Sequence, residues 1–183
     1  MDLETLRSLQ EAARLHAVRA FIGKDTQYNP HLLNITEINE CAISQYETWL
    51  TQYDFGWERV LKWEQRSAHF AAIDVAIWYD GRLAGLCWAT PKQSREKVFV
   101  LYLERNPDNA LPTKGYIAPL GLRAVCSYGL LLDMRYIVVN DPDPGARRAY
   151  QTEGFHFIPG IGLAYDLTRE YDGHNREADS YEQ

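Results

Sequence analysis

The sequence contains few of the residues from which metal centres and disulfide frameworks are built. It has three cysteines, Cys41, Cys87 and Cys126, an odd number whose spacing matches no zinc-binding pattern. Each cysteine lies within an apolar stretch, so we expect buried free thiols, as in a cytoplasmic protein. No cluster of cysteine, histidine and aspartate suggests a metal site, and no serine or cysteine lies in a recognisable nucleophile motif.

Long apolar runs and an excess of positive charge are also absent. No apolar stretch approaches the ~20 residues of a membrane-spanning helix, and the acidic, amphipathic N-terminus resembles neither a signal peptide nor a transit peptide. Lysine and arginine number 19 against 25 aspartate and glutamate, a formal net charge of −6. This balance argues against non-specific nucleic-acid binding and permits a cationic substrate. We therefore expect neither a membrane nor a nucleic acid as a partner.

The pattern of the chain predicts one α/β domain, for which 183 residues provide a sufficient core. Up to residue 89 the predicted elements are an amphipathic helix over 2–22, a strand over 31–35, helices over 36–52 and 57–67, and strands over 70–79 and 82–89. The last two strands flank Asp80-Gly81, which is the pattern of a β-hairpin. The polar segment 170–183 predicts a flexible tail.

The stretch from Val98 to Phe157 carries the most information. It predicts a strand over 98–104, a helix over 119–134 and a strand over 135–139, and therefore a βαβ unit with parallel strands. Such a unit leaves a crevice at the carboxyl ends of its strands, where a helix N-terminus favours the phosphates of a cofactor. A short helix and a strand beginning at His156 close the unit.

The closing segment has a distinctive spacing, formed by Asp143, Ala146, Tyr150, Gly154 and Phe155. Ala146 and Tyr150 share one helical face, Gly154 suits a left-handed helix end, and Phe155 buries the start of the next strand. Coming after a βαβ unit, this spacing resembles the closing half of GCN5-related N-acetyltransferases (GNAT).

The resemblance implies a mixed central sheet of about six strands flanked by helices, over residues 32–168. GNAT domains usually open with a strand, so the helix over residues 1–23 is interpreted as an addition. It would pack on the domain itself or give a homodimer a surface.

The resemblance also implies acetyl-CoA as the acyl donor. In this family the fourth strand splays from the fifth and its backbone holds the pantetheine arm, which here points to Leu101, Tyr102 and Leu103. The family's phosphate-binding loop maps onto residues 113–118, where the sequence departs from the pattern and only Ala118 agrees. The remaining residues predicted to contact the cofactor are Lys114, Gly115, Asp143, Ala146 and Arg147, with Arg148 beside them.

Two residues are the candidates for proton transfer. Tyr150 is predicted to protonate the departing thiolate, and Glu104, at the end of the fourth strand, to accept the proton of the amine. Tyr150 could instead be a core tyrosine, and Glu104 an exposed partner of Arg105. Asp74 is a lesser candidate, because it could simply face solvent.

The predicted function is therefore N-acetyl transfer from acetyl-CoA to a primary amine by direct attack, with no metal. The acceptor is a small-molecule or peptide amine, bound near residues 46–63 and 91–97. The aromatic residues there line the pocket or belong to the core: Trp49, Tyr53, Phe55, Trp57 and Trp63. The alternative is a GNAT-like protein that uses another acyl carrier, or that has lost catalysis and serves as a binding or regulatory module. A plain α/β interaction protein is the third possibility.

Overall fold

The computed structural model describes residues 1–22, 29–51, 55–63, 69–139 and 141–168. Its centre is a seven-stranded mixed sheet in the order β1-β2-β3-β4-β5-β7-β6. The strands are β1 (Leu33–Thr36), β2 (Ile73–Tyr79), β3 (Arg82–Thr90), β4 (Lys97–Arg105), β5 (Tyr136–Val139), β6 (His156–Ile158) and β7 (Gly162–Asp166). β4 and β5 pair in parallel and the other neighbours pair antiparallel, so the predicted α/β fold with a mixed sheet is confirmed.

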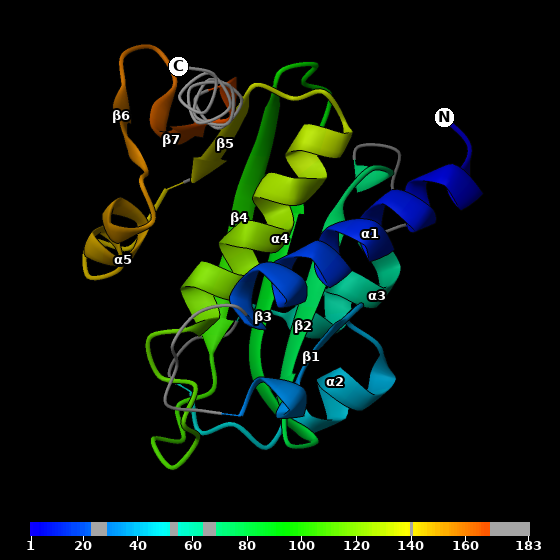
Figure 1. The fold of residues 1–183 in the computed structure, drawn as a ribbon, viewed down its shortest axis with the longest axis vertical. Coiled ribbons are helices and arrows are strands. Elements are labelled where there is room, and N and C mark those ends of the chain that lie inside the picture. Colours follow the sequence, from blue (N-terminus) through cyan, green and yellow to red (C-terminus); the bar gives the residue numbers. More distant parts are fainter. Residues whose placement is uncertain (23–28, 52–54, 64–68, 140, 169–183) are drawn as a thin grey trace, which may run out of the picture.

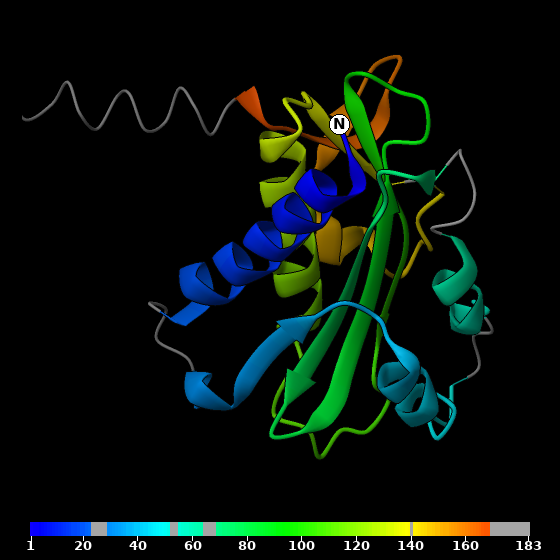
Figure 2. The ribbon, with the colours of Figure 1, turned by 90° about the vertical axis from the view of Figure 1, so that its right-hand side faces the viewer.

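Helices cover both faces of this sheet (Figures 1 and 2). α1 (Leu3–Ile22) and α4 (Ile117–Leu131) lie together on one face, and α2 (Glu40–Tyr46) and α3 (Val60–Trp63) lie on the other. α5 (Arg147–Thr152) lies beside the carboxyl-terminal half of β4 (Figure 1). Two short 3-10 helices, η1 (Pro30–Leu32) and η2 (Trp57–Arg59), precede β1 and α3.

The three local motifs predicted from the sequence are present. Asp80 and Gly81, at φ 50° and 71°, form the tight turn between β2 and β3, as left-handed residues do in a two-residue hairpin. β4, α4 and β5 form the βαβ unit. Gly154 has φ 88° directly after α5, and Phe155 behind it is 2% exposed. The closing motif therefore has the local structure that its spacing indicated.

The predicted N-terminal helix packs within the chain. α1 lies against α4 and β1 and buries Leu6, Ala13, Ala17 and Phe21. Small residues at 13 and 17, on one helical face, let α1 approach its neighbours closely. The ring of Phe21 meets that of Tyr116 edge-to-face at 5.3 Å, directly before α4.

Several boundaries and one strand differ from prediction. The helix expected over 36–52 is shorter and spans Glu40–Tyr46. It begins at Glu40 because Asn39 caps it by accepting a 3.0 Å hydrogen bond from the N–H of Ala42. Cys41 is consequently exposed rather than buried, and Cys126 is half-buried; only Cys87 is a core thiol. β7 was not predicted, although Pro159-Gly160 is a turn signal that marks the boundary between β6 and β7. The predicted tail lies outside the described residues.

Two glycines let α4 approach the sheet. A Cβ on Gly85 of β3 would lie 2.2 Å from Cγ2 of Ile117, the first residue of α4. A Cβ on Gly121 would lie 3.1 Å from a methyl carbon of Leu103 on β4. Both positions lack a side chain because a helix and a strand come into direct contact there.

This contact gives a testable expectation for Gly85→Ala. The added methyl group displaces Ile117 and with it the start of α4, so we expect a loss of about 1–3 kcal/mol in the free energy of unfolding. Urea titration measures the loss. Gly81→Ala is unsuitable as a control because its φ is 71°, whereas Ala84→Gly, at the buried neighbouring position in β3, should cost only ~1 kcal/mol. Equal stability of Gly85→Ala and the wild-type protein would contradict this account of the contact.

Candidate active site

β4 and β5 separate halfway along β4. Their parallel pairing begins at Lys97 with Tyr136 and ends at Val100 with Val139, whereas β4 continues to Arg105. Residues 101–105 therefore have no β5 partner within the described chain. The backbone edge of β4 along this stretch is open to a ligand, which is the geometry that an extended molecule needs to add itself to a strand.

A β-bulge at Leu101 sets which side chains face this opening. Val100 pairs with Ala89 and Tyr102 with Trp88, so Leu101 is the extra residue on β4. The bulge shifts the alternation of β4. Val100 lies in the core beneath α1 and α4, and Tyr102 packs on the opposite face among the aromatic residues near α2 and α3. Leu103 again faces α4.

Two adjoining cavities fill the space between β4, α4 and α5. They share the lining residues Leu103, Ala146 and Tyr150, so they lie side by side, and we name the two together the β4–α5 groove. The cavity at its α4 end has a volume of about 570 Å³. Its lining comprises Leu103, Arg105, Gly115, Ile117, Ala118, Pro119, Ala146, Arg148, Ala149, Tyr150, Thr152 and Glu153.

The α4 end of the groove can attract an anion. Its charged side chains are Arg105, Arg148 and Glu153, and the N-terminus of α4 opens into it. The first hydrogen bond inside α4 joins the N–H of Leu120 to the carbonyl of Tyr116 at 3.0 Å. The N–H groups of Ile117 and Ala118 therefore have no acceptor within the helix, and the helix dipole is positive there.

The cavity at the other end of the groove, which we call the Phe55 end, has a volume of about 330 Å³. Leu101, Tyr102 and Tyr150 line it together with Phe55 and the segment 141–144. Its only charged lining residues among those described are Asp141 and Asp143. The two ends of the groove thus differ in charge, cationic near α4 and acidic near Phe55.

Tyr150 lies in the wall common to both cavities. α5 directs it inward, its ring meets that of Phe155 at 5.9 Å, and it is 7% exposed. Burial, and to a lesser degree the nearby Cys87 thiol, raises the pKa of Tyr150 to about 12. The phenol is therefore protonated at neutral pH, the form that a proton donor requires.

Glu104 is buried behind the groove rather than exposed beside Arg105. Thr51 donates a hydrogen bond of 2.8 Å to its Oε1, and the indole N–H of Trp57 donates one of 2.7 Å to its Oε2. Desolvation raises the pKa of Glu104, and these two hydrogen bonds act against the rise. Glu104 is not among the residues that line either cavity; it lies on the face of β4 that carries Tyr102.

The predicted cofactor residues fall into two groups. Leu103, Gly115, Ala118 and Ala146 line the α4 end, and Leu101, Tyr102 and Asp143 line the Phe55 end. Lys114 and Arg147 are exposed and lie outside both linings, whereas Arg148 lies in one. The sequence did not predict Arg105 or Ile117 as cofactor residues, although both line the α4 end. Arg105 was identifiable as a cation at the end of the splayed strand, but nothing in the sequence shows that Ile117 opens α4.

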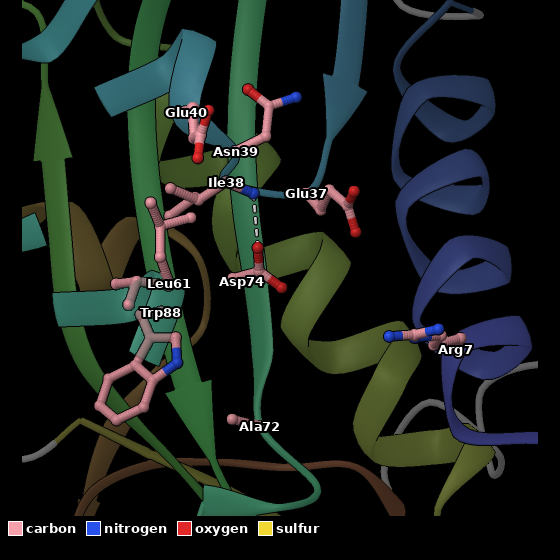
Figure 3. A pocket seen from close by; sticks show the side chains of 10 residues that line it. Arg7, Glu37, Ile38, Asn39, Glu40, Leu61, Ala72, Asp74 and Trp88 are labelled. Atoms are coloured by element: carbon pink, nitrogen blue, oxygen red, sulfur yellow. Dashed lines mark hydrogen bonds between the residues drawn. The ribbon is translucent and has the colours of Figure 1, made fainter. Parts of the chain in front are cut away.

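Asp74 is not a solvent-facing residue. It lies in a separate cavity of about 260 Å³ at the start of β2, between the β1–α2 loop and α1 (Figure 3). Its Oδ1 forms an ion pair of 2.9 Å with Arg14, and its Oδ2 accepts a hydrogen bond from the N–H of Ile38. Arg14 also donates to the carbonyl of Asp74 at 2.9 Å. Because Arg14 belongs to α1 and Asp74 to β2, these contacts attach α1 to the sheet. Burial raises the pKa of Asp74, and the charge of Arg14 opposes the rise.

Two other kinds of feature are absent from the described part of the chain. No group of three histidine, cysteine, aspartate or glutamate side chains there is arranged to hold a metal ion. No helix within those same ranges is both long enough and apolar enough to cross a bilayer.

Solved structures with the same fold are acetyltransferases. The aminoglycoside 6′-N-acetyltransferase from Enterococcus faecium matches with a TM-score of 0.56 over 73% of this chain and 96% of its own, at 15% identity. A Desulfovibrio desulfuricans protein assigned as an acetyltransferase of the GNAT family gives 0.53 over 74% and 98%, at 14% identity. A Salmonella typhimurium protein assigned as an acetyltransferase, in complex with its cofactor acetyl-CoA, gives 0.51 over 74% and 94%, at 14% identity. No protein-family model and no curated protein matches this sequence. At these identities the likeness establishes the fold.

Proposed function

We propose that the chain is a GNAT-type N-acetyltransferase that transfers the acetyl group of acetyl-CoA to a primary amine by direct attack. The observation that carries the proposal is the separation of β4 from β5 beyond Val100, with the N-terminus of α4 and Tyr150 opening into the same groove. The fold shared with acetyltransferases, one of them in complex with acetyl-CoA, supports it.

Within this proposal the parts of acetyl-CoA would lie along the groove in order. The α4 end would take the phosphates, through the N–H groups of Ile117 and Ala118 and the side chains of Arg105 and Arg148. The open backbone of residues 101–103 would hold the pantetheine arm as an added strand does. The Phe55 end, which residues 101–103 also line, would then hold the thioester beside Tyr150, and the acceptor amine would reach it there. Acetyl-CoA supplies the activated acyl group, and the protein supplies alignment and proton transfer.

The reaction requires one bond to form and one to break. The lone pair of the neutral amine forms the new C–N bond, and the C–S bond of the thioester breaks with its electron pair left on sulfur. We assign Tyr150 as the proton donor to that sulfur, because its phenol remains protonated within the groove. We assign Glu104 as the eventual acceptor of the amine proton. Glu104 and its hydrogen-bond partner Thr51 line neither cavity, so the proton would reach them by way of solvent. Solvent then restores both groups.

Two observations favour the second candidate function, binding of another acyl carrier or of none. Pro119 occupies the first turn of α4 and has no N–H group, so the helix offers one donor fewer to a pyrophosphate. Lys114, the cation of the predicted loop, lies outside the groove lining.

Thermal unfolding with and without acetyl-CoA tests the proposed function. A ligand that binds only the folded state at a hundredfold excess over Kd stabilises it by about 2.7 kcal/mol. For a chain of this length we expect Tm to rise by roughly 5–10 °C. An unchanged Tm at saturating acetyl-CoA would favour the second candidate function, and the same scan with longer acyl-CoA molecules would then identify a carrier.

Two adjacent arginines provide a matched control for this measurement. Arg148 lines the groove, whereas its neighbour Arg147 is exposed outside it. We expect Arg148→Glu to reduce the acetyl-CoA-dependent rise in Tm, and Arg147→Glu to leave it close to the wild-type value. An equal reduction in both variants would show a diffuse electrostatic effect instead of a contact with the phosphates.

A further inference from the structure

We propose that the acceptor is the terminal amine of an extended peptide that carries acidic residues after its first two positions. The peptide would lie on the face of the sheet that carries Tyr102, over the first half of β4 and over β5. This inference rests on the proposed acetyltransferase function, because it starts from the place where the thioester would be held. The side chains that would recognise the peptide lie outside the β4–α5 groove.

The opening between β4 and β5 reaches both faces of the sheet. The cavity that would hold the thioester is lined by Leu103 and Tyr150, which pack in the core beneath α1 and α4. The same cavity is lined by Phe55 and Tyr102, which pack in the cluster beneath α2 and α3. Because the donor would occupy the side of α4 and α5, the acceptor must approach the thioester from the opposite face.

Beside this opening, the opposite face carries a small apolar strip. Its register places Lys97 of β4 next to Tyr136 of β5, and Phe99 next to Val138. The alternate residues of both strands lie in the core beneath α1 and α4, so these four side chains point to the other face. Phe99, Tyr136 and Val138 form a cluster with strand β7, to which no described helix contributes. We name Lys97, Phe99, Tyr136 and Val138 the outer strip.

Three cations lie in or over the outer strip. The ammonium group of Lys92, in the β3–β4 loop, lies 4.9 Å from the centroid of the Phe99 ring. The guanidinium group of Arg135, directly before β5, lies 4.8 Å from that of Tyr136. Lys97 is half-buried within the strip. Among the described residues, no carboxylate forms an ion pair with any of the three. In a chain with a net charge of −6, they form a local excess of positive charge.

The nearby acidic residues do not cancel this excess. Asp166 of β7 pairs with Tyr136 and so shares its face, but its Oδ1 already accepts hydrogen bonds of 3.1 Å and 2.7 Å from the N–H and hydroxyl groups of Thr168. The β3–β4 loop adds one further charge of each sign, Arg95 and Glu96, both exposed. The outer strip therefore favours an anionic ligand.

The arrangement of the cations favours several anions over a single one. Lys92 and Arg135 are each held over a separate ring, one on β4 and one on β5, and a cation–π contact leaves the charge available to a ligand. A lone phosphate group binds most strongly where donors converge on it, whereas carboxylates spaced along a chain can pair with cations one at a time. An acidic peptide therefore fits the outer strip better than a small phosphorylated amine.

The length of the strip sets where the acidic residues must lie. Leu101, at the edge of the opening, and Lys97 are four residues apart on β4, which is roughly 13 Å at about 3.3 Å per residue. An extended peptide whose amine lies at the opening covers this distance with its first four or five residues. Its third to fifth side chains would then lie over the outer strip, within reach of Lys92, Lys97 and Arg135.

The test compares alanine peptides of equal length, with a free N-terminus, at saturating acetyl-CoA. Their third to fifth residues are glutamate, glutamine or lysine. We expect kcat/KM for the glutamate peptide to exceed that for the glutamine peptide by about tenfold, mainly through KM, since each exposed ion pair is of modest strength. The lysine peptide should be the poorest of the three. High salt should reduce these differences, because it screens exposed charges.

Reversing the charge of the strip should reverse the preference. In the Lys92→Glu/Arg135→Glu variant we expect the lysine peptide to become a better acceptor than the glutamate peptide. Arg7→Glu/Arg19→Glu is the matched control, because it changes the net charge by the same amount at two exposed positions of α1, on the other side of the sheet. We expect the control to keep the preference of the wild-type protein.

The outcomes separate this inference from the proposed function. Equal kcat/KM for the three peptides, or an unchanged preference in the Lys92→Glu/Arg135→Glu variant, overturns the inference. So does a higher kcat/KM for O-phosphoethanolamine, a small amine with one phosphate group, than for the glutamate peptide. Acetyl-CoA binding without acetylation of any peptide overturns the inference and leaves the proposed function standing. Failure of acetyl-CoA to bind overturns both.

Discussion

Replacing Tyr150 by phenylalanine should lower kcat by about 10²- to 10³-fold, the size of effect that a positioned general acid contributes. Without the phenol, the thiolate must leave unprotonated or take its proton from solvent. The substitution removes one oxygen and keeps the aromatic ring that packs against Phe155 at 5.9 Å. Among the described residues, none forms a hydrogen bond with the Tyr150 hydroxyl, so Tm should stay close to the wild-type value. Steady-state kinetics and a thermal scan measure both quantities.

Tyr136→Phe is the control for this variant. Tyr136 is as buried as Tyr150, with 8% exposure against 7%, but lies in β5 outside the groove lining. We expect it to keep the wild-type kcat. Because the pKa of Tyr150 is about 12, its ionisation should not reduce kcat below roughly pH 11. Activity of Tyr150→Phe within about twofold of the wild-type value would make Tyr150 a packing residue.

The second large effect is expected from Glu104→Gln. Glutamine has the same shape and can still accept the hydrogen bond from Trp57, but it cannot take a proton. We therefore expect kcat to fall by about 10²-fold or more and the acidic limb of the pH profile to change, while the fold is retained. Glu104→Ala should in addition lower stability by about 1–3 kcal/mol, because the buried N–H of Trp57 loses its acceptor.

Comparing Glu104→Gln with Glu104→Ala distinguishes a catalytic role of Glu104 from a purely structural one. If Glu104 only anchors Trp57, Glu104→Gln should remain active, and only Glu104→Ala should lose both activity and stability. That result would refute the assignment of Glu104 as the proton acceptor. It would mean that the buried carboxylate serves to hold the Trp57 ring against Phe55 and Tyr102.

Stability against pH provides a test of the raised pKa itself. The pKa of Glu104 is higher in the folded than in the unfolded protein because burial disfavours the charged form. The folded state therefore binds the proton more tightly, and this contribution to stability is full below the unfolded pKa and is lost as pH rises through the folded pKa. Glu104→Gln lacks this ionisable group. Its Tm should therefore increase relative to that of the wild-type protein as pH rises from the unfolded pKa through the folded pKa. A difference that does not vary with pH would contradict the shift.

Local patterns in the sequence determined the elements and much of their order. Alternation around Asp80-Gly81 predicted the hairpin, and the apolar runs after Val98 predicted the βαβ unit. The spacing of Ala146, Tyr150 and Gly154 predicted the helix and left-handed end that direct Tyr150 inward. These features depend on residues a few positions apart, so local conformation and burial suffice to specify them.

Only the tertiary structure decided how distant segments share the site. The bulge at Leu101 places Tyr102 and Glu104 on the face opposite Leu103, and a one-residue shift of this kind depends on pairing with β3. The hydrogen bonds that Glu104 accepts from Thr51 and Trp57 join residues that are 53 and 47 positions apart in the sequence. Which of two adjacent arginines enters the groove depends on the angle at which α5 packs, since neighbouring helical residues point in different directions. The sequence by itself therefore determined the fold and the inward position of Tyr150 on α5. The packing of the elements determined the charge of each groove end, because charge at a site is a sum over segments that only folding brings together.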